Sequence, residues 1–438
     1  MKARKNVLFI GYPLLAVFCI ACSGAVTTPS GKAPQKPGSA VAKKEKKRTR
    51  PAVKKAAKRP DSMKAPVAAL PKAAVPASEA KGEKPALITP RSVRPLMQIE
   101  AGRNDSNPTW STTGKLIAVE RSKGDKKEIV IARPDGSIVQ TVYYQLSSDN
   151  SQGMEFFFPG LFEDVSYNAG ISWSPKGDRI VFMSNGGEGN YDCYLRELGS
   201  KKTVRLTKHK EKDGQAHWSP VDDVVVFVSG RTGRGDIYLM DIGTREITRL
   251  TQGGKAYLYP QWSPKGKKVA LIHGSNENHD IYVINDVKEP VQSLTALTSW
   301  KHDDLRPVWS PDGKKIAFYS NYNPEDDPKV WSLIVIAADG SDPKRGQGLS
   351  EKVVATDVIP DVERGPAWMP DSERIVYVKN DRQKYNPLYV VDIEEKTNLP
   401  LKTNTKMNHD VSCSAKGLIS FRAQVRRWDH VFIAELKR

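Results

Sequence analysis

The stretch Pro307-Val308-Trp309-Ser310-Pro311-Asp312-Gly313-Lys314-Lys315-Ile316-Ala317-Phe318 is one of the clearest copies of a pattern that recurs along this chain. A nearly identical copy begins at Pro260. Each copy is anchored on one residue, and the anchors are Trp110, Trp173, Trp218, Trp262, Trp309, Trp368 and a degenerate Cys413. Repeats at such a spacing decide the fold class before any single residue does.

Each copy predicts two strands joined by a tight turn, followed by two further strands. A short apolar segment ends at the anchor, Ser-Pro-x-Gly turns the chain, and an apolar run such as residues 180–183 follows. Residues 280–284 are typical of a third strand, and the fourth ends in Arg-Leu-Thr at residues 249–251. Four antiparallel strands make one blade of a β-propeller, and the Trp side chains should fill the gaps between blades. The sequence therefore predicts an all-β propeller of seven four-stranded blades, or six if the weak Cys413 copy belongs to another blade.

The last repeat lacks a fourth strand of its own, because the sequence ends shortly after the third strand at residues 430–434. Just before the first Trp, residues 95–102 match the fourth-strand pattern of residues 249–254. We therefore expect an N-terminal strand to complete the last blade and close the ring, which would leave few open sheet edges.

The N-terminus is typical of an export signal. Three basic residues precede an apolar stretch that is too short to span a bilayer, and Ala21-Cys22-Ser23-Gly24 follows. This box resembles a bacterial lipoprotein cleavage site, so we expect a signal peptide over residues 1–21 and lipidation of Cys22. The alternative is an ordinary secretory signal. Of the other cysteines, Cys193 and Cys413 are expected to be free buried thiols.

Residues 22–93 are rich in Lys, Ala and Pro and poor in large apolar side chains, so they cannot bury enough surface to fold. We expect a disordered basic tether here, and a propeller domain over residues 94–438. The whole chain has a formal charge of +18, but residues 23–93 alone carry 17 Lys and Arg against four Asp and Glu. Because the propeller itself is nearly neutral, it lacks the basic surface of a nucleic-acid binder. The tether is either a solvated spacer or a segment attracted to anionic lipids.

The Trp-Ser-Pro-Asp-Gly-Lys-Lys-Ile-Ala-Phe string and the Asp-Ile-Tyr-Val third strand resemble the repeats of TolB-like periplasmic β-propellers. The resemblance covers the chain from about Pro95 onward. It implies a non-catalytic periplasmic protein that binds another protein. In TolB itself the propeller follows an N-terminal α/β domain and binds a peptidoglycan-associated lipoprotein, whereas here the basic segment stands in that place. Similar repeats in prolyl-oligopeptidase-like enzymes gate a C-terminal hydrolase domain, which we do not expect in this chain.

Polar residues recur five positions before each anchor. Three are Asp and one is Glu, and a cation such as Ca²⁺ or a basic group would relieve their repulsion if they met at one mouth of the channel. The alternative is that they only form turn and capping hydrogen bonds at the start of each blade. Apart from Tyr257, the set consists of Asp105, Asn168, Asp213, Asp304, Glu363 and Asn408.

A long insertion between the first two repeats carries a dense aromatic cluster: Phe156, Phe157, Phe158 and Phe162. If exposed, these side chains would anchor a protein partner. If buried, they would cap or plug the propeller.

The chain contains none of the usual catalytic motifs for acyl transfer, metalloproteolysis or phosphate binding. We therefore expect a non-catalytic, monomeric lipoprotein of the cell envelope, anchored in the periplasm to the outer membrane, whose propeller is a scaffold for a protein partner. The alternative function is a receptor that binds a small ligand or cation at the acidic mouth of the channel. No cofactor is expected apart from such a cation.

Overall fold

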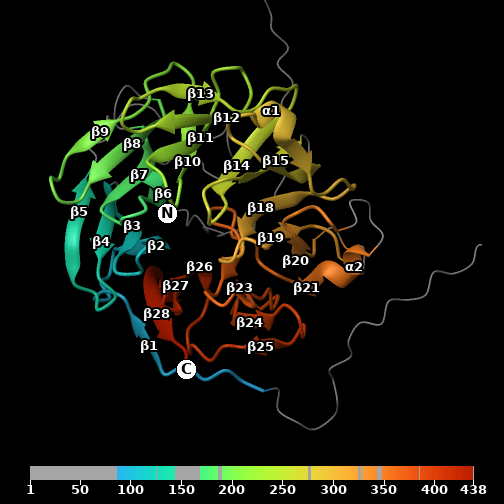
Figure 1. Ribbon diagram of the computed structural model, residues 1–438. Coiled ribbons are helices and arrows are strands. Elements are labelled where there is room, and N and C mark those ends of the chain that lie inside the picture. Colours follow the sequence, from blue (N-terminus) through green and yellow to red (C-terminus); the bar gives the residue numbers. More distant parts are fainter. Residues whose placement is uncertain are drawn as a thin grey trace, which may run out of the picture. The chain divides into compact units, whose positions relative to one another are not determined.

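The structure is a computed structural model that describes residues 86–124, 126–143, 168–185, 190–274, 278–323, 327, 329–342, 348–383 and 385–437. Within these ranges, 28 strands form seven four-stranded sheets that stand as blades around a central axis (Figure 1). The predicted seven-bladed propeller is confirmed, and the six-bladed alternative is wrong.

The first four blades follow the chain in order, and within each blade the first strand is the innermost (Figure 1). The first blade consists of β2 (Asn104–Trp110), β3 (Ile117–Lys123), β4 (Lys126–Ala132) and β5 (Ile138–Tyr143), and the second of β6 (Asn168–Trp173), β7 (Arg179–Ser184), β8 (Asp192–Glu197) and β9 (Thr203–Arg205). The third blade consists of β10 (Asp213–Trp218), β11 (Val224–Ser229), β12 (Asp236–Asp241) and β13 (Ile247–Arg249). The fourth consists of β14 (Ala256–Trp262), β15 (Val269–Gly274), β16 (His279–Ile284) and β17 (Leu294–Ala296).

The only two helices among the described residues, α1 (Pro290–Ser293) and α2 (Leu349–Lys352), directly precede the outermost strands of the fourth and fifth blades, β17 and β21. The fifth blade consists of β18 (Asp304–Trp309), β19 (Lys315–Ser320), β20 (Ser332–Ala337) and β21 (Val353–Ala355), and the sixth of β22 (Ala367–Trp368), β23 (Arg374–Val378), β24 (Leu388–Asp392) and β25 (Asn398–Pro400). The seventh blade consists of β26 (His409–Cys413), β27 (Leu418–Val425), β28 (Trp428–Glu435) and the N-terminal β1 (Ser92–Pro95).

The Trp-Ser-Pro-x-Gly turn explains why the pattern recurs. In the copy at residues 309–313, Ser310 accepts a hydrogen bond from the backbone N–H of Lys315 (2.9 Å), which closes the turn. Gly313 has a φ of 74°, a conformation that costs glycine little and other residues more. The same serine-closed turn joins the first two strands of the blades at Ser111, Ser174, Ser263 and Ser414.

The Trp anchors lie between neighbouring blades, as predicted. Trp218 is 1% exposed and packs in one apolar cluster with Leu195 of the preceding blade and Phe227 of its own. The indole Nε1 of Trp173 donates to the carbonyl oxygen of Thr109, one residue before the preceding anchor (3.0 Å). Trp309 and Trp368 repeat this bond to the preceding blade at 3.1 Å. The core of this propeller is therefore the set of interfaces between blades.

The two ends of the propeller close the ring together. β1 pairs with β28 in antiparallel register, with Val93 opposite Ala434, so the predicted closure is confirmed. The strand lies earlier than the predicted segment at residues 95–102, and Ile88 already makes a bridge to Leu401, ahead of the expected domain start at residue 94. The side chains that follow β1, Leu96 and Met97, are buried in the apolar cluster between the last and first blades.

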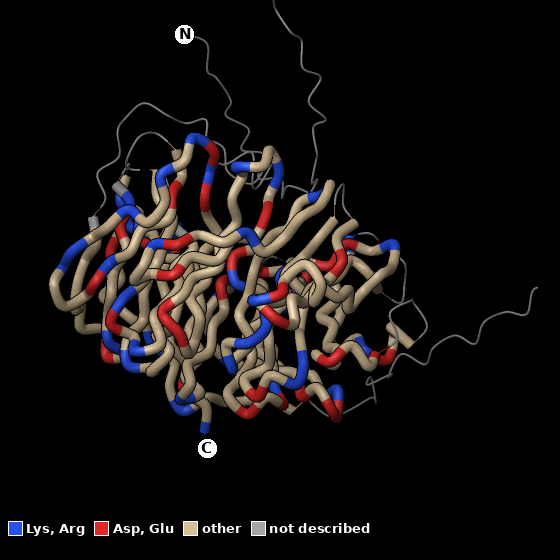
Figure 2. The backbone as a smooth tube through the Cα atoms, turned by 45° about the horizontal axis from the view of Figure 1, so that its top comes forward, with Lys and Arg blue, Asp and Glu red and all other residues tan. Residues whose placement is uncertain are grey.

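Several sequence predictions concern residues outside the described ranges. These are the signal peptide over residues 1–21, the lipidated Cys22, most of the tether and the four phenylalanines of the insertion. In the part of the chain that is described, no helix has the length and apolar character needed to cross a bilayer. Basic and acidic residues are mixed over the propeller in Figure 2, in keeping with its low net charge.

Candidate functional site

Every blade has one residue in a left-handed conformation three positions before its anchor. The φ values at these positions lie between 50° and 82°. In six of the seven blades, the pairing register with the second strand shifts across this position, which is the signature of a β-bulge. The seven left-handed residues are Asn107, Gly170, Gln215, Tyr259, Arg306, Gly365 and Asp410. All except Gly365, which precedes β22, lie at such a bulge.

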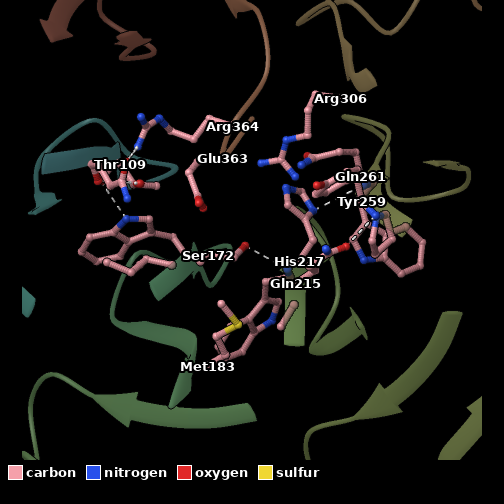
Figure 3. Close-up of a pocket in the computed structure, with 18 of the residues that line it drawn as sticks. Thr109, Ser172, Met183, Gln215, His217, Tyr259, Gln261, Arg306, Glu363 and Arg364 are labelled. Carbon is pink, nitrogen blue, oxygen red and sulfur yellow. Dashed lines mark hydrogen bonds between the residues drawn. The ribbon is translucent and has the colours of Figure 1, made fainter. Parts of the chain in front are cut away.

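Five of these residues border a cavity of about 330 Å³ at the centre of the ring: Asn107, Gly170, Gln215, Tyr259 and Arg306. Gln215, Tyr259 and Arg306 come from three consecutive blades, and Glu363 enters from the loop before β22 (Figure 3). Apolar side chains such as Trp173 complete the wall. A second hollow of about 390 Å³ shares Asn107, Glu120 and Glu363 with this cavity.

One side of the cavity is held by a network that joins the first, sixth and seventh blades. The Arg364 guanidinium pairs with Asp361 (2.9 Å) and, more distantly, with Asp410 (3.7 Å), and it donates to the side-chain oxygen of Asn107 (3.1 Å). The Asn107 amide nitrogen donates in turn to Glu120 (2.9 Å). Burial alone would lower the pKa of Arg364, but the neighbouring carboxylates outweigh burial and raise the pKa. Arg364 is therefore a fixed, paired cation.

Two titratable side chains of the cavity have strongly shifted pKa values. Burial, reinforced by the charge of Glu363, raises the pKa of Glu120 to about 8. Burial, reinforced by the charge of Arg306, lowers the pKa of His217 to about 4. At neutral pH, Glu120 is thus largely protonated and His217 is neutral.

Arg306 differs from Arg364 because no carboxylate binds it. Its side chain is buried, and its Cζ lies 4.4 Å from the ring centroid of Tyr259. Among the described residues, it forms no ion pair, and its Nε has no hydrogen-bond partner. Burial lowers its pKa, a shift that the charge of Glu363 partly opposes.

The polar set predicted from the sequence is not brought together by the structure. Asp105, Asp213 and Asp304 lie within their own blades and are at most 1% exposed. Asp105 pairs with Arg121 (2.7 Å), and Asp213 pairs with Arg231 (3.0 Å).

The other members are placed differently from one another. Asp304 accepts a hydrogen bond from the indole of Trp300 (3.0 Å), and burial raises the pKa of its carboxyl well above the ordinary value. Asn408 is buried and donates to the carbonyl oxygen of Asn386 (2.9 Å). Asn168 begins β6, but its side chain is outside the described part of the structure. Only Glu363 lines the cavity. None of the three Asp residues of the set lines this cavity. Within the described residues, no group of three or more His, Cys, Asp or Glu side chains could hold a metal ion.

The bulge explains the missed site residues. The sequence analysis placed the residues five positions before each anchor at the channel mouth, but a bulge between these residues and the anchor changes which side chains face the channel. The cavity residues missed by the sequence analysis are Gln215, Tyr259 and Arg306, three positions before their anchors. The available signal was the frequency of Gly, Asn and Asp at that position, because these residues tolerate a positive φ best.

Comparison with known proteins identifies the repeats. Residues 163–348 match the family model described as the TolB β-propeller domain. Over these residues the chain resembles the TolB β-propeller domain. The resemblance inferred from the Trp-anchored string is confirmed. Among curated proteins, none matches the sequence.

Solved structures similar to this TolB-like propeller include proteins of several kinds. A TolB from Acinetobacter baumannii is 18% identical, with 69% of this chain and 64% of that chain covered and a TM-score of 0.44. This chain thus spans less than two thirds of that TolB. An oligogalacturonate lyase in complex with manganese is 12% identical, with 81% and 96% covered and a TM-score of 0.57. A puromycin-hydrolyzing peptidase from Mycobacterium tuberculosis is 14% identical, with 77% and 52% covered and a TM-score of 0.56. At these identities the likeness shows the fold alone.

Proposed function

We propose that this TolB-like propeller is a non-catalytic scaffold that binds another protein of the bacterial cell envelope. The observation that carries the proposal is the match of residues 163–348 to the TolB propeller family. The closed ring gives further support, because interblade packing and β1 make it a rigid platform with paired edges. The enzymes among the similar structures share the fold at 12–14% identity, so they do not favour a shared chemistry.

The proposed location is the periplasm, with a lipid on Cys22 as the anchor to the outer membrane. The lipoprotein-type box after the apolar N-terminal stretch supports this location, as does the basic segment that follows it. The tether would allow a monomeric propeller to reach a partner away from the membrane surface.

The scaffold proposal is tested by crosslinking the full chain inside a Gram-negative envelope and purifying it through a C-terminal tag. We expect one dominant crosslinked partner. We take the aromatic insertion as the proposed interface. A variant with Phe156, Phe157, Phe158 and Phe162 changed to Ser should then lose most of that product, because aromatic anchors dominate interface energies.

The matched control is the Ile138→Ser/Val139→Ser variant. These residues on β5 are 51% and 40% exposed, so the control removes exposed apolar area outside the insertion. If both variants lose the crosslinked product, or if neither does, the interface does not lie at the insertion. No specific product from the wild-type chain would contradict the scaffold proposal itself.

The second candidate function is a receptor for a small ligand. The central cavity favours it, because the buried Arg306 lines that space and forms no ion pair among the described residues. A cation at an acidic mouth has less support, since Asp105 and Asp213 are bound to arginines.

A further inference from the structure

The Arg306 side chain is the most unusual polar group of the channel. It is 6% exposed, and its backbone φ is 56°, which is uncommon for any residue other than glycine. Burying a charge without a carboxylate partner is costly, and protein arginines at such depth are normally paired. Arg103, Arg121 and Arg364 of this propeller follow that rule. Arg306 has no such carboxylate among the described residues, so its guanidinium is available to a ligand in the cavity.

Two further donors near Arg306 have fixed orientations. The backbone N–H of Tyr259 donates to the side-chain oxygen of Gln215 (2.7 Å), so the amide nitrogen must be at the other end of that group. This nitrogen is buried and has no partner among the described residues. The backbone N–H of Trp262 donates to Nδ1 of His217 (3.3 Å), so the proton of the neutral ring is on Nε2. Arg306, Gln215 and His217 therefore supply hydrogen-bond donors to the cavity.

A carboxylate completes the charge pattern. Glu363 lines the same cavity but forms no ion pair with Arg306, although both side chains turn toward the interior in Figure 3. Because the Arg306 guanidinium and the Glu363 carboxylate line one cavity without pairing, a ligand with both a negative and a positive group could lie between them. A dianion such as phosphate is less suitable, because the charge of Glu363 would repel it.

We propose that the central cavity binds a small zwitterion of the amino-acid class, with its carboxylate against Arg306 and Gln215 and its ammonium group against Glu363. The planar guanidinium can hold a carboxylate through two parallel hydrogen bonds. The volume of about 330 Å³ suits a ligand of that size, and Ile171, Met183 and Trp173 give an apolar wall for its side chain. This proposal names the ligand class for the receptor candidate and is independent of the scaffold, because the crosslinked partner and the cavity ligand are measured separately.

The test is titration calorimetry of the purified propeller with the twenty standard amino acids and a set of dipeptides at millimolar concentration. Binding of free amino acids alone, or of dipeptides alone, would identify the source of the zwitterion. For the best ligand, we expect the analogue without the carboxylate and the analogue without the ammonium group to bind at least about tenfold more weakly. Arg306→Gln and Glu363→Gln should each produce a similar loss.

Arg245→Gln is the matched control, because Arg245 also has a positive φ, 66°, but lies in an exposed turn. It should bind like the wild type. The proposal is overturned if no zwitterion binds, if inorganic phosphate binds as well as the best zwitterion, or if both cavity variants retain wild-type affinity. Should Arg306→Gln fail to fold, Glu363→Gln and the two ligand analogues still decide the outcome.

Discussion

At the scale of single residues, burial in the channel changes the protonation of the Glu120 carboxyl group. Glu120 is half-buried and faces Glu363, Asp410 and Arg364, and Asn107 donates to its carboxylate. Its pKa of about 8 means that the folded protein holds a proton that the unfolded chain, at an ordinary 4.5, releases earlier. The folded state therefore binds more protons between these values, and the contribution of Glu120 to stability falls as the pH rises through that window.

We predict that the free energy of unfolding of the wild type falls relative to Glu120→Gln between about pH 5 and about pH 8, by on the order of 2 kcal/mol. Gln has the hydrogen-bonding ability of the protonated acid but does not ionise. Urea unfolding at a series of pH values measures the difference between the two proteins. Glu395→Gln, in an exposed turn, is the control and should show no such divergence. A constant difference between wild type and Glu120→Gln would contradict the shifted pKa.

At the scale of the elements, the seven blades share one left-handed backbone position next to the channel, but the residue at that position differs between blades. All seven have the same left-handed position, yet glycine occupies it only in the second and sixth blades. The surroundings of these two glycines differ. A Cβ on Gly170 would meet no heavy atom within 4 Å, whereas a Cβ on Gly365 would lie 2.7 Å from the carbonyl oxygen of Arg306.

This contrast predicts unequal costs for the same substitution. Gly170→Ala should lose only the left-handed preference of glycine, about 1–2 kcal/mol of unfolding free energy. Gly365→Ala should lose about 3 kcal/mol or more, because the backbone of the neighbouring blade must also move. Chemical denaturation of both variants provides the comparison. Equal losses of unfolding free energy would show that the backbone around Gly365 and Arg306 can move apart without a measurable energetic cost.

The sequence was sufficient for the blades but not for the channel lining. Trp anchors, serine-closed turns and apolar runs have fixed spacings, so the number of blades and the closure by an N-terminal strand were predictable. Bulges add a residue without changing the spacing of the anchors. The sequence analysis therefore selected Asp213, which pairs with Arg231 inside its blade, while Gln215 borders the cavity two residues later.

At the scale of the whole molecule, the propeller is nearly neutral and the N-terminal segment carries most of the +18 charge. A folded domain of balanced charge has little electrostatic reason to associate with a membrane. Localisation should therefore depend on the N-terminal segment, and on Cys22 in particular.

We predict that Cys22→Ala abolishes incorporation of labelled palmitate and releases the protein from the membrane fraction of a Gram-negative host. Cys193→Ala and Cys413→Ala are matched controls, because both thiols lie in the propeller and are free. These variants should remain labelled and membrane-bound. Labelling that persists in Cys22→Ala would favour the ordinary secretory signal.

The pairing of β1 with β28 also determines when this protein can finish folding. Residues 92–95 are synthesised before all the other strands, but their partner strand at residues 428–435 follows only after all the intervening blades. A contact between such distant parts of a chain raises the contact order, which slows folding. The intervening blades reduce the entropic cost of this closure, because each blade that stacks on its neighbour brings the two ends nearer. Ring closure is thus expected to be the final and slowest step of folding, and until then the outer edge of β28 has no partner.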